Sequence, residues 1–267
     1  MSSALVADVK EMVREQVEYR DLLYQMTKRD LLLRYKQTVM GFGWAVFMPL
    51  VNTAIFSVVF TRVAPIDPGV PYPVFAFCGL WVWNFFASAL KFSVNSLTSN
   101  TNLVTKVYFP REIFPVSAVF VSLVDFAVGG IVLVALMIYY QLAPGVSILA
   151  LPLIIAVHLV FTTAVALLLA MANLFYRDVK YLFEVVIMVW MFGSSVVYPV
   201  SLVGGRLGTL MHLNPMTSII DAYRSVLLLG VWPSPVAMAG VATFSLMLLA
   251  WAWLVFHRSE FEFAENV

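Results

Sequence analysis

The sequence predicts an all-α integral membrane protein with six transmembrane helices, an N-terminal amphipathic interface helix and two re-entrant helices at the outer surface. Of its 267 residues, 62% are hydrophobic and only 12% are charged, whereas soluble domains carry about 25% charged residues. After residue 40 the apolar residues form long runs, and a run of about 20 crosses a bilayer as a helix. Continuous runs of this length exclude the short alternating strands of a membrane β-barrel.

Residues 1–40 form an arm that does not span the membrane. Apolar residues recur there at helical spacing between charged ones, first from Leu5 to Val17 and again from Leu22 to Leu33. We interpret the arm as an amphipathic helix or helix pair in the cytoplasmic membrane interface; a soluble helix packed on the inner loops is the alternative. No cleavable signal peptide is expected, because the first apolar run is long enough to span the membrane.

Residues 41–267 form the transmembrane domain, and the charges orient it. Thirteen of the 16 Lys and Arg residues fall on the side of the N-terminal arm, and basic residues concentrate in cytoplasmic segments. Both termini are therefore expected in the cytoplasm. The six spans are expected at Phe42–Arg62, Tyr72–Val94, Phe114–Tyr139, Ile148–Tyr176, Phe183–Val203 and Val236–Phe256.

The remaining composition excludes several classes of function. Cys78 is the single cysteine, which excludes an intrachain disulfide and a multi-cysteine metal site. A net charge of +1 favours no nucleic-acid partner. The histidines, His158, His212 and His257, are scattered, so we expect no metal site and no catalytic centre. None of the 13 glycines precedes a lysine, so the chain lacks the Gly-Lys-Ser/Thr loop that cradles nucleotide phosphates.

Asp125 lies about halfway along the third span, four residues before the Gly129–Gly130 pair. Ionisable groups are costly in lipid and are usually paired or functional, and small residues permit close helix approach. Asp125 is therefore interpreted either as a residue of a channel or dimer seam, or as a structural acceptor for a neighbouring helix.

Four segments resemble a known family. They are YRDLLYQMTKRDLLLRYKQTVMGFGW (Tyr19–Trp44), LVTKVYFPREIFP (Leu103–Pro115), NLFYRDVKYL (Asn173–Leu182) and LNPMTSIIDAYRSVLLLG (Leu213–Gly230). In this order and spacing they look like the signatures of type-2 ABC exporter permeases, in the branch that exports O-antigen, teichoic acid or galactan.

The resemblance implies a homodimer around a central channel, with two copies of a separate ABC ATPase subunit. It implies a lipid-linked polysaccharide as substrate and the bacterial plasma (inner) membrane as location. No cofactor is expected in this chain, because ATP and Mg would be bound by the partner subunit. Alternatives are a drug or lipid exporter of the same superfamily and a membrane-embedded transferase, although a transferase predicts clustered His and Asp residues.

The resemblance also assigns roles to two inner loops and one outer segment. Residues Thr101–Arg111 and Tyr176–Tyr181 would couple to the ATPase, through Lys106, Tyr108, Arg111, Glu112, Tyr176, Arg177 and Asp178. The segment between spans five and six would form re-entrant gate helices that carry Asn214, Pro215, Asp221, Tyr223 and Arg224; a seventh partial span is the alternative. Asp221 and Arg224 are three residues apart, so they are expected to pair on one helix face.

Aromatic and polar residues share a face of the second span. Phe77, Trp81, Asn84, Phe85 and Ser88 recur at helical spacing, and Trp190 lies mid-span in the fifth. Sugars offer C–H faces that suit aromatic rings and hydroxyls that need polar neighbours. These six residues are therefore candidates to line a polysaccharide path, with core packing as the alternative.

Overall fold

The structure, a computed structural model, describes residues 14, 18–36, 40–41, 43–106 and 109–266. Every regular element in these residues is helical. In chain order the α-helices are α2 (Arg20–Tyr35), α3 (Gly43–Val58), α4 (Tyr72–Val94), α5 (Thr101–Lys106), α6 (Ile113–Tyr139), α7 (Leu151–Phe175), α8 (Val179–Phe192), α9 (Gly205–Leu213), α10 (Pro215–Leu227) and α11 (Pro235–Asn266).

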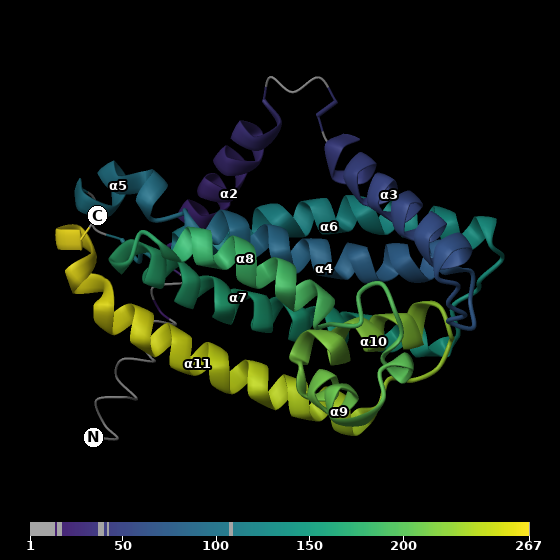
Figure 1. The fold of residues 1–267 in the computed structure, drawn as a ribbon. Helices are drawn as coiled ribbons and strands as arrows, with labels where there is room; N and C mark the ends of the chain where they lie inside the picture. The colour runs from purple at the N-terminus through teal and green to yellow at the C-terminus, as the bar shows by residue number, and fades with distance from the viewer. Residues whose placement is uncertain (1–13, 15–17, 37–39, 42, 107–108, 267) are drawn as a thin grey trace.

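Four long helices, α4, α6, α7 and α11, form the body of the molecule (Figure 1). α5 and the C-terminal end of α11 lie at one end of this body, and α9 and α10 lie at the other. Five segments of the described chain are long and apolar enough to cross a membrane: Val46–Val63, Tyr72–Val94, Ile113–Tyr139, Val146–Phe175 and Pro235–Phe263. They overlap five of the six expected spans, with the last extending seven residues further than expected.

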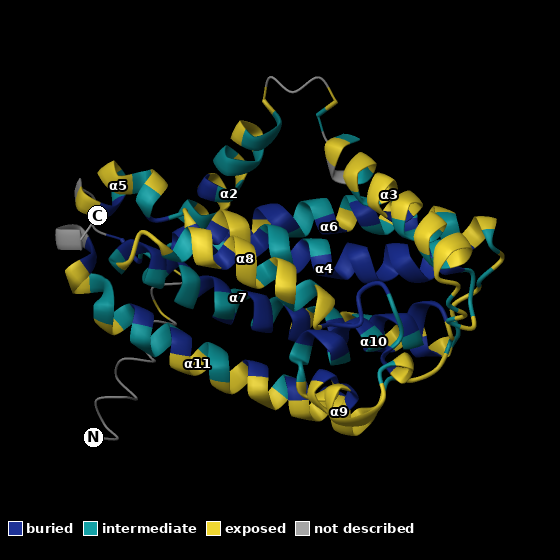
Figure 2. Ribbon diagram, in the orientation of Figure 1, coloured by how far each residue is buried: buried dark blue, intermediate teal, exposed yellow. Residues whose placement is uncertain are grey.

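α4 is the central helix. It is buried over most of its length, whereas α3 is mostly exposed (Figure 2). A helix that is apolar on all sides is typical of a core position, and α4 contacts α3, α6, α7, α8 and α10. A separate apolar cluster at the end of the body that carries α5 joins Met26 of α2 to Phe114 of α6 and Phe256 of α11.

α2 and α3 lie on one side of the body and converge toward each other at the top of the view (Figure 1). α2 packs on α6 through Met26, while Tyr24, Leu32 and Leu33 stay exposed. The earlier stretch of the predicted arm, from Leu5 to Val17, lies outside the described residues apart from Arg14.

The fifth expected span, 183–203, differs from the prediction, because its helix ends at Phe192. The 14 residues of α8 reach about 21 Å, less than the roughly 30 Å of a bilayer core. Gly193 follows, and Ser194 and Ser195 begin an irregular, buried turn before Pro199. Hydropathy alone reads this stretch as helix, because the turn residues up to Val203 are nearly as apolar as those of α8.

The outer segment contains two short helices, α9 and α10, as the sequence predicts. Pro215 starts α10, and the Asn214 side chain accepts a hydrogen bond from the Met216 backbone N–H, 3.1 Å away, which satisfies a free donor of the first turn. α10 contacts α4, α7 and α11. Its Tyr223 packs on Trp81, about 14 Å along α4 from Tyr72, so α10 extends alongside the spanning helices.

Candidate functional site

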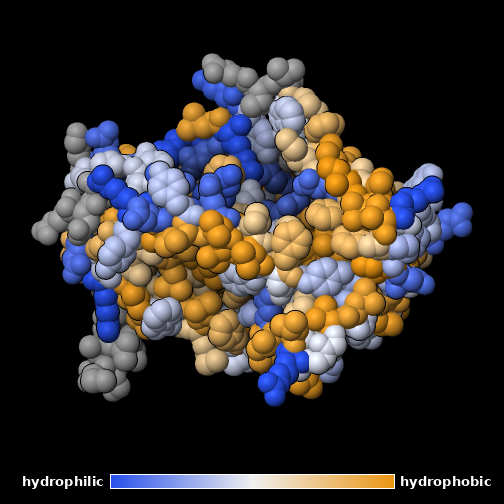
Figure 3. All heavy atoms as spheres, in the orientation of Figure 1, coloured by the Kyte–Doolittle hydropathy of each residue, from blue (hydrophilic) through white to orange (hydrophobic). Residues whose placement is uncertain are grey.

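A cavity of about 800 Å³ lies between α2, α3, α4, α6 and α8. α4 supplies one wall through Trp81, Asn84, Phe85 and Ser88, whose spacing of three or four residues places them on one helix face. Hydrophilic side chains gather in the recess between α2 and α3, while the surface of α3 beside it is hydrophobic (Figure 3). Four of the six residues predicted to line a path therefore meet at one cavity.

Asp125 faces this cavity from α6 and joins that helix to the end of α2. Its Oδ2 lies 2.7 Å from Nη1 of Arg34, and its Oδ1 accepts a hydrogen bond from the Tyr35 hydroxyl. Arg34 also donates to Ser88 Oγ at 3.0 Å and lies 4.1 Å from the centre of the Phe92 ring. Burial and the hydrogen bond to Asp125 raise the pKa of Tyr35 above its ordinary value. Asp125 is thus a structural acceptor that also lines a cavity.

Arg34 and Tyr35 are not among the site residues predicted from the sequence. The available signal was Asp125 itself, because a carboxylate inside a span needs a cationic or hydrogen-bonding partner. Arg34 and Tyr35, near the end of the amphipathic arm, are such partners.

The glycine pair of α6 makes room for the aromatic wall of the cavity. The Trp81 ring stacks on Phe126, with centroids 3.9 Å apart, and its Nε1 donates to the Phe126 carbonyl at 2.7 Å. A Cβ on Gly129 would lie 2.7 Å from the Trp81 ring, and one on Gly130 would lie 3.3 Å away. The predicted close approach at Gly129–Gly130 is therefore made by a tryptophan side chain.

Phe77 and Trp190 lie outside the cavity. Phe77 is fully buried in the core. Trp190 packs edge-on against Phe86, and its Nε1 donates to Asn214 Oδ1 at 3.0 Å. Trp190 thus connects α8 to the start of α10, so these two aromatic residues pack the core between helices.

Arg224 of α10 binds the irregular turn that follows α8. The guanidinium donates to the carbonyls of Ser195 and, at 2.6 Å, Val196, and it lies 3.6 Å from the centre of the Phe75 ring. Asp221 lies 3.8 Å from Arg224, as the spacing predicts, and accepts a hydrogen bond from Ser195 Oγ at 2.8 Å. Non-helical backbone at membrane depth requires such internal partners.

The remaining residues predicted for an outer gate also bind this turn or the core. Asn214 donates to the Gly193 carbonyl and to Ser194 Oγ, at 3.0 and 2.8 Å, and Tyr223 is fully buried. Gly79 of α4, which was not predicted from the sequence, also contacts this turn: an added Cβ would lie 2.1 Å from the Val196 carbonyl oxygen. A lone glycine in an apolar helix gives little signal of such a close approach.

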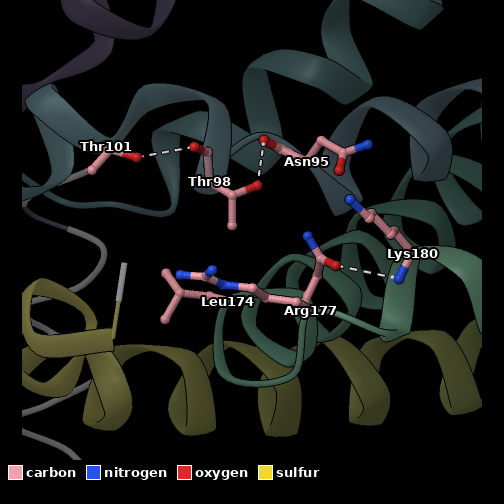
Figure 4. Close-up of a pocket in the computed structure, with 7 residues that line it drawn as sticks. Asn95, Thr98, Thr101, Leu174, Arg177 and Lys180 are labelled. Carbon is pink, nitrogen blue, oxygen red and sulfur yellow. Dashed lines mark hydrogen bonds between the residues drawn. The ribbon is translucent and has the colours of Figure 1, made fainter.

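The second inner loop lies on the surface as predicted. Tyr176, Arg177 and Asp178 are exposed between α7 and α8. Arg177 lines a pocket of about 190 Å³ between this loop and the short turn before α5 (Figure 4). The other residues around the pocket are Asn95, Thr98, Thr101, Asn173, Leu174 and Lys180. The two inner loops therefore meet at one polar, basic hollow.

Arg111 and Glu112 of the first inner loop contact α11. The Arg111 side chain donates to the carbonyls of Val104 and Glu260, at 3.2 and 2.9 Å. Glu112 is 2% exposed and accepts a hydrogen bond from Trp253 Nε1 at 3.2 Å. Lys106 ends α5, and Tyr108 lies outside the described residues.

Comparison with known proteins identifies the family. A family model described as ABC-2 type transporter matches residues 21–228. The chain belongs to the ABC-2 type transporter family. The match begins in α2 and extends one residue past α10, so it includes the residues around the cavity and the pair α9–α10 of this ABC-2 protein.

Three relatives carry the name O-antigen export system permease protein RfbA. One from Myxococcus xanthus is 28% identical over 96% of this chain and 99% of its own length. One from Klebsiella pneumoniae is 28% identical over 92% of this chain and 94% of its own length. Another from Klebsiella pneumoniae is 30% identical over 79% of this chain and 81% of its own length. The chain is thus an integral membrane protein of the ABC-2 family with near full-length similarity to bacterial export permeases.

Proposed function

We propose that the chain is the permease subunit of an ATP-driven exporter that moves a lipid-linked polysaccharide, of the O-antigen type or related, out across the plasma membrane. The observation that carries this proposal is the similarity over 96% of the chain to a named O-antigen export permease. The α4 wall of the cavity supports it, because Trp81 and Phe85 alternate with the hydrogen-bonding side chains of Asn84 and Ser88. Such a surface suits a polymer with apolar ring faces and many hydroxyls.

The cavity is the inner part of the proposed path, and a second copy of the chain would complete it. α3 and α8 border the cavity and expose apolar side chains such as Trp44, Phe47, Val185 and Met188. Two copies related by a twofold axis would place these helices around one channel. We therefore propose a homodimer, with the outer pair α9–α10 beside the exit.

A separate ATPase supplies the energy in this proposal, and it binds the nucleotide and Mg²⁺. Arg177 and Asp178 are exposed on the second inner loop, next to the pocket between the two loops. A partner seated on that pocket would contact both loops at once. Because the second inner loop leads directly into α8, a movement of this loop would also move α8, which borders the cavity.

The cavity is tested with Asn84→Trp in the reconstituted permease–ATPase complex. Asn84 lines the cavity, and the larger ring would narrow it. We expect polysaccharide export to fall at least ten-fold. Ala239→Trp, on the exposed face of α11, is the control and should export normally. Normal export by Asn84→Trp would contradict the path; stimulation of the ATPase by small amphiphiles and not by glycans would favour a drug or lipid exporter.

Coupling is tested with Arg177→Glu, using Arg206→Glu as the control because Arg206 is exposed on α9 at the opposite end. We expect the inner substitution to abolish glycan-stimulated ATP hydrolysis and to weaken co-purification of the ATPase. The outer substitution should change neither. Unchanged coupling in Arg177→Glu would remove the second inner loop from the proposed contact.

A further inference from the structure

Three potential metal ligands meet at the end of the body that carries α5, away from the cavity. They are Glu112, immediately before α6, and His257 and Glu260 on α11. Each offers one ligand atom, and these atoms all lie within 4.8 Å of one another. The cluster cannot be recognised from the sequence, because Glu112 lies far from His257 and Glu260 along the chain.

The distances fit ligands around one metal ion. His257 Nδ1 lies 3.5 Å from Glu112 Oε1 and 3.8 Å from Glu260 Oε2. Two ligands bound to one tetrahedral ion at about 2.1 Å are about 3.4 Å apart.

The charges also favour a bound cation. Glu112 is 2% exposed, and its Oε2 is buried with no hydrogen-bond partner within the described part of the chain. Arg111 lies 3.7 Å from Glu260 Oε1, so its charge offsets one of the two carboxylates. The side-chain N–H groups of Arg111 also donate to backbone carbonyls, those of Val104 and Glu260. A buried carboxylate is costly unless it is paired or binds a metal.

We propose that Glu112, His257 and Glu260 bind a divalent transition-metal ion of the Zn²⁺ type. One imidazole and two carboxylates suit such ions, whereas Mg²⁺ prefers oxygen ligands and water. His257 and Glu260 are three residues apart on one helix, a spacing that places ligands on the same face. Trp253 donates to Glu112 Oε1 and would orient this ligand. The ion would tie the start of α6 to the end of α11.

The test uses the full-length chain, purified in detergent and stripped with a chelator. Zn²⁺ binding is measured by competition with a chromophoric chelator, and Co²⁺ substitution by visible absorption. We expect one ion per chain, no competition from millimolar Mg²⁺, and a Zn²⁺-dependent rise in Tm. Glu112→Gln and His257→Gln should each lower the affinity at least ten-fold. His212→Gln, an exposed histidine on α9, is the matched control and should bind normally.

Glu112→Gln keeps the size and shape of the side chain, so a folded variant with weak Zn²⁺ binding separates ligation from packing. The proposal is overturned if the wild-type chain binds no Zn²⁺, or if binding is equal in the wild type, Glu112→Gln and His257→Gln. It is also overturned if Zn²⁺ raises the Tm of wild type and Glu112→Gln by the same amount.

Discussion

Replacing Arg224 by Met tests whether the turn after α8 is held by α10. The substitution keeps an apolar stem of similar length but removes the donors to the Ser195 and Val196 carbonyls. Both carbonyls belong to buried residues, and a buried acceptor left without a partner costs about 1–3 kcal/mol. The two together predict a loss of roughly 2–6 kcal/mol, or a Tm lower by at least about 4 °C.

The assay is thermal unfolding of the detergent-purified chain. Arg206→Met is the control, because Arg206 is exposed on α9 and its replacement should leave the Tm within about 1 °C. Arg224→Lys retains the charge without the planar fork that reaches two carbonyls, so it should fall between wild type and Arg224→Met. Equal Tm values for wild type and Arg224→Met would refute the inference that Arg224 stabilises this turn.

Three further substitutions test other contacts. Gly79→Ala should lower the Tm, because its Cβ would lie 2.1 Å from the Val196 oxygen, whereas Gly240→Ala, with open space around it, should leave the Tm unchanged or raise it. Asp125→Asn removes the ion pair with Arg34, and we expect faster thiol labelling of a cysteine placed at Ala87, which also lines the cavity. An unchanged labelling rate would show that this ion pair does not restrict access to the cavity. Trp190→Phe removes the hydrogen bond to Asn214 and should cost about 0.5–1.5 kcal/mol in urea unfolding, with no loss arguing against that contact.

The sequence predicts the elements whose signal is local. Five spans follow from runs of apolar residues, and the start of α10 follows from Asn214 and Pro215, which have defined positions at a helix N-terminus. The α4 face from Trp81 to Ser88 follows from helical spacing. Each of these predictions needs only residues that are neighbours along one helix.

Contacts between residues far apart in the chain could not be predicted in this way. The resemblance assigns Arg111 and Glu112 to ATPase coupling, and the structure adds contacts of these residues with Glu260 and Trp253 of α11. Phe77 and Trp81 lie on the same face of α4, but other helices cover α4 on several sides. Phe77 therefore faces the core, whereas Trp81 lines the cavity. Periodicity identifies a face of a helix and does not identify what covers it.

The contact between α2 and α6 changes the role expected of the N-terminal arm. A helix that only rested on the inner surface would keep its charges in water or near lipid headgroups, yet Arg34 and Tyr35 bind Asp125 in the wall of the cavity. Breaking the ion pair would leave the partly buried Asp125 carboxylate without its cation, which is unfavourable. A displacement of α2 along the membrane would therefore move Arg34 and change the polar lining of the cavity. If Asp125 did not follow, its carboxylate would lose the Arg34 cation. Because α2 also packs through Met26 on the apolar cluster with Phe114 and Phe256, one helix contacts both the end of the body near α5 and the cavity.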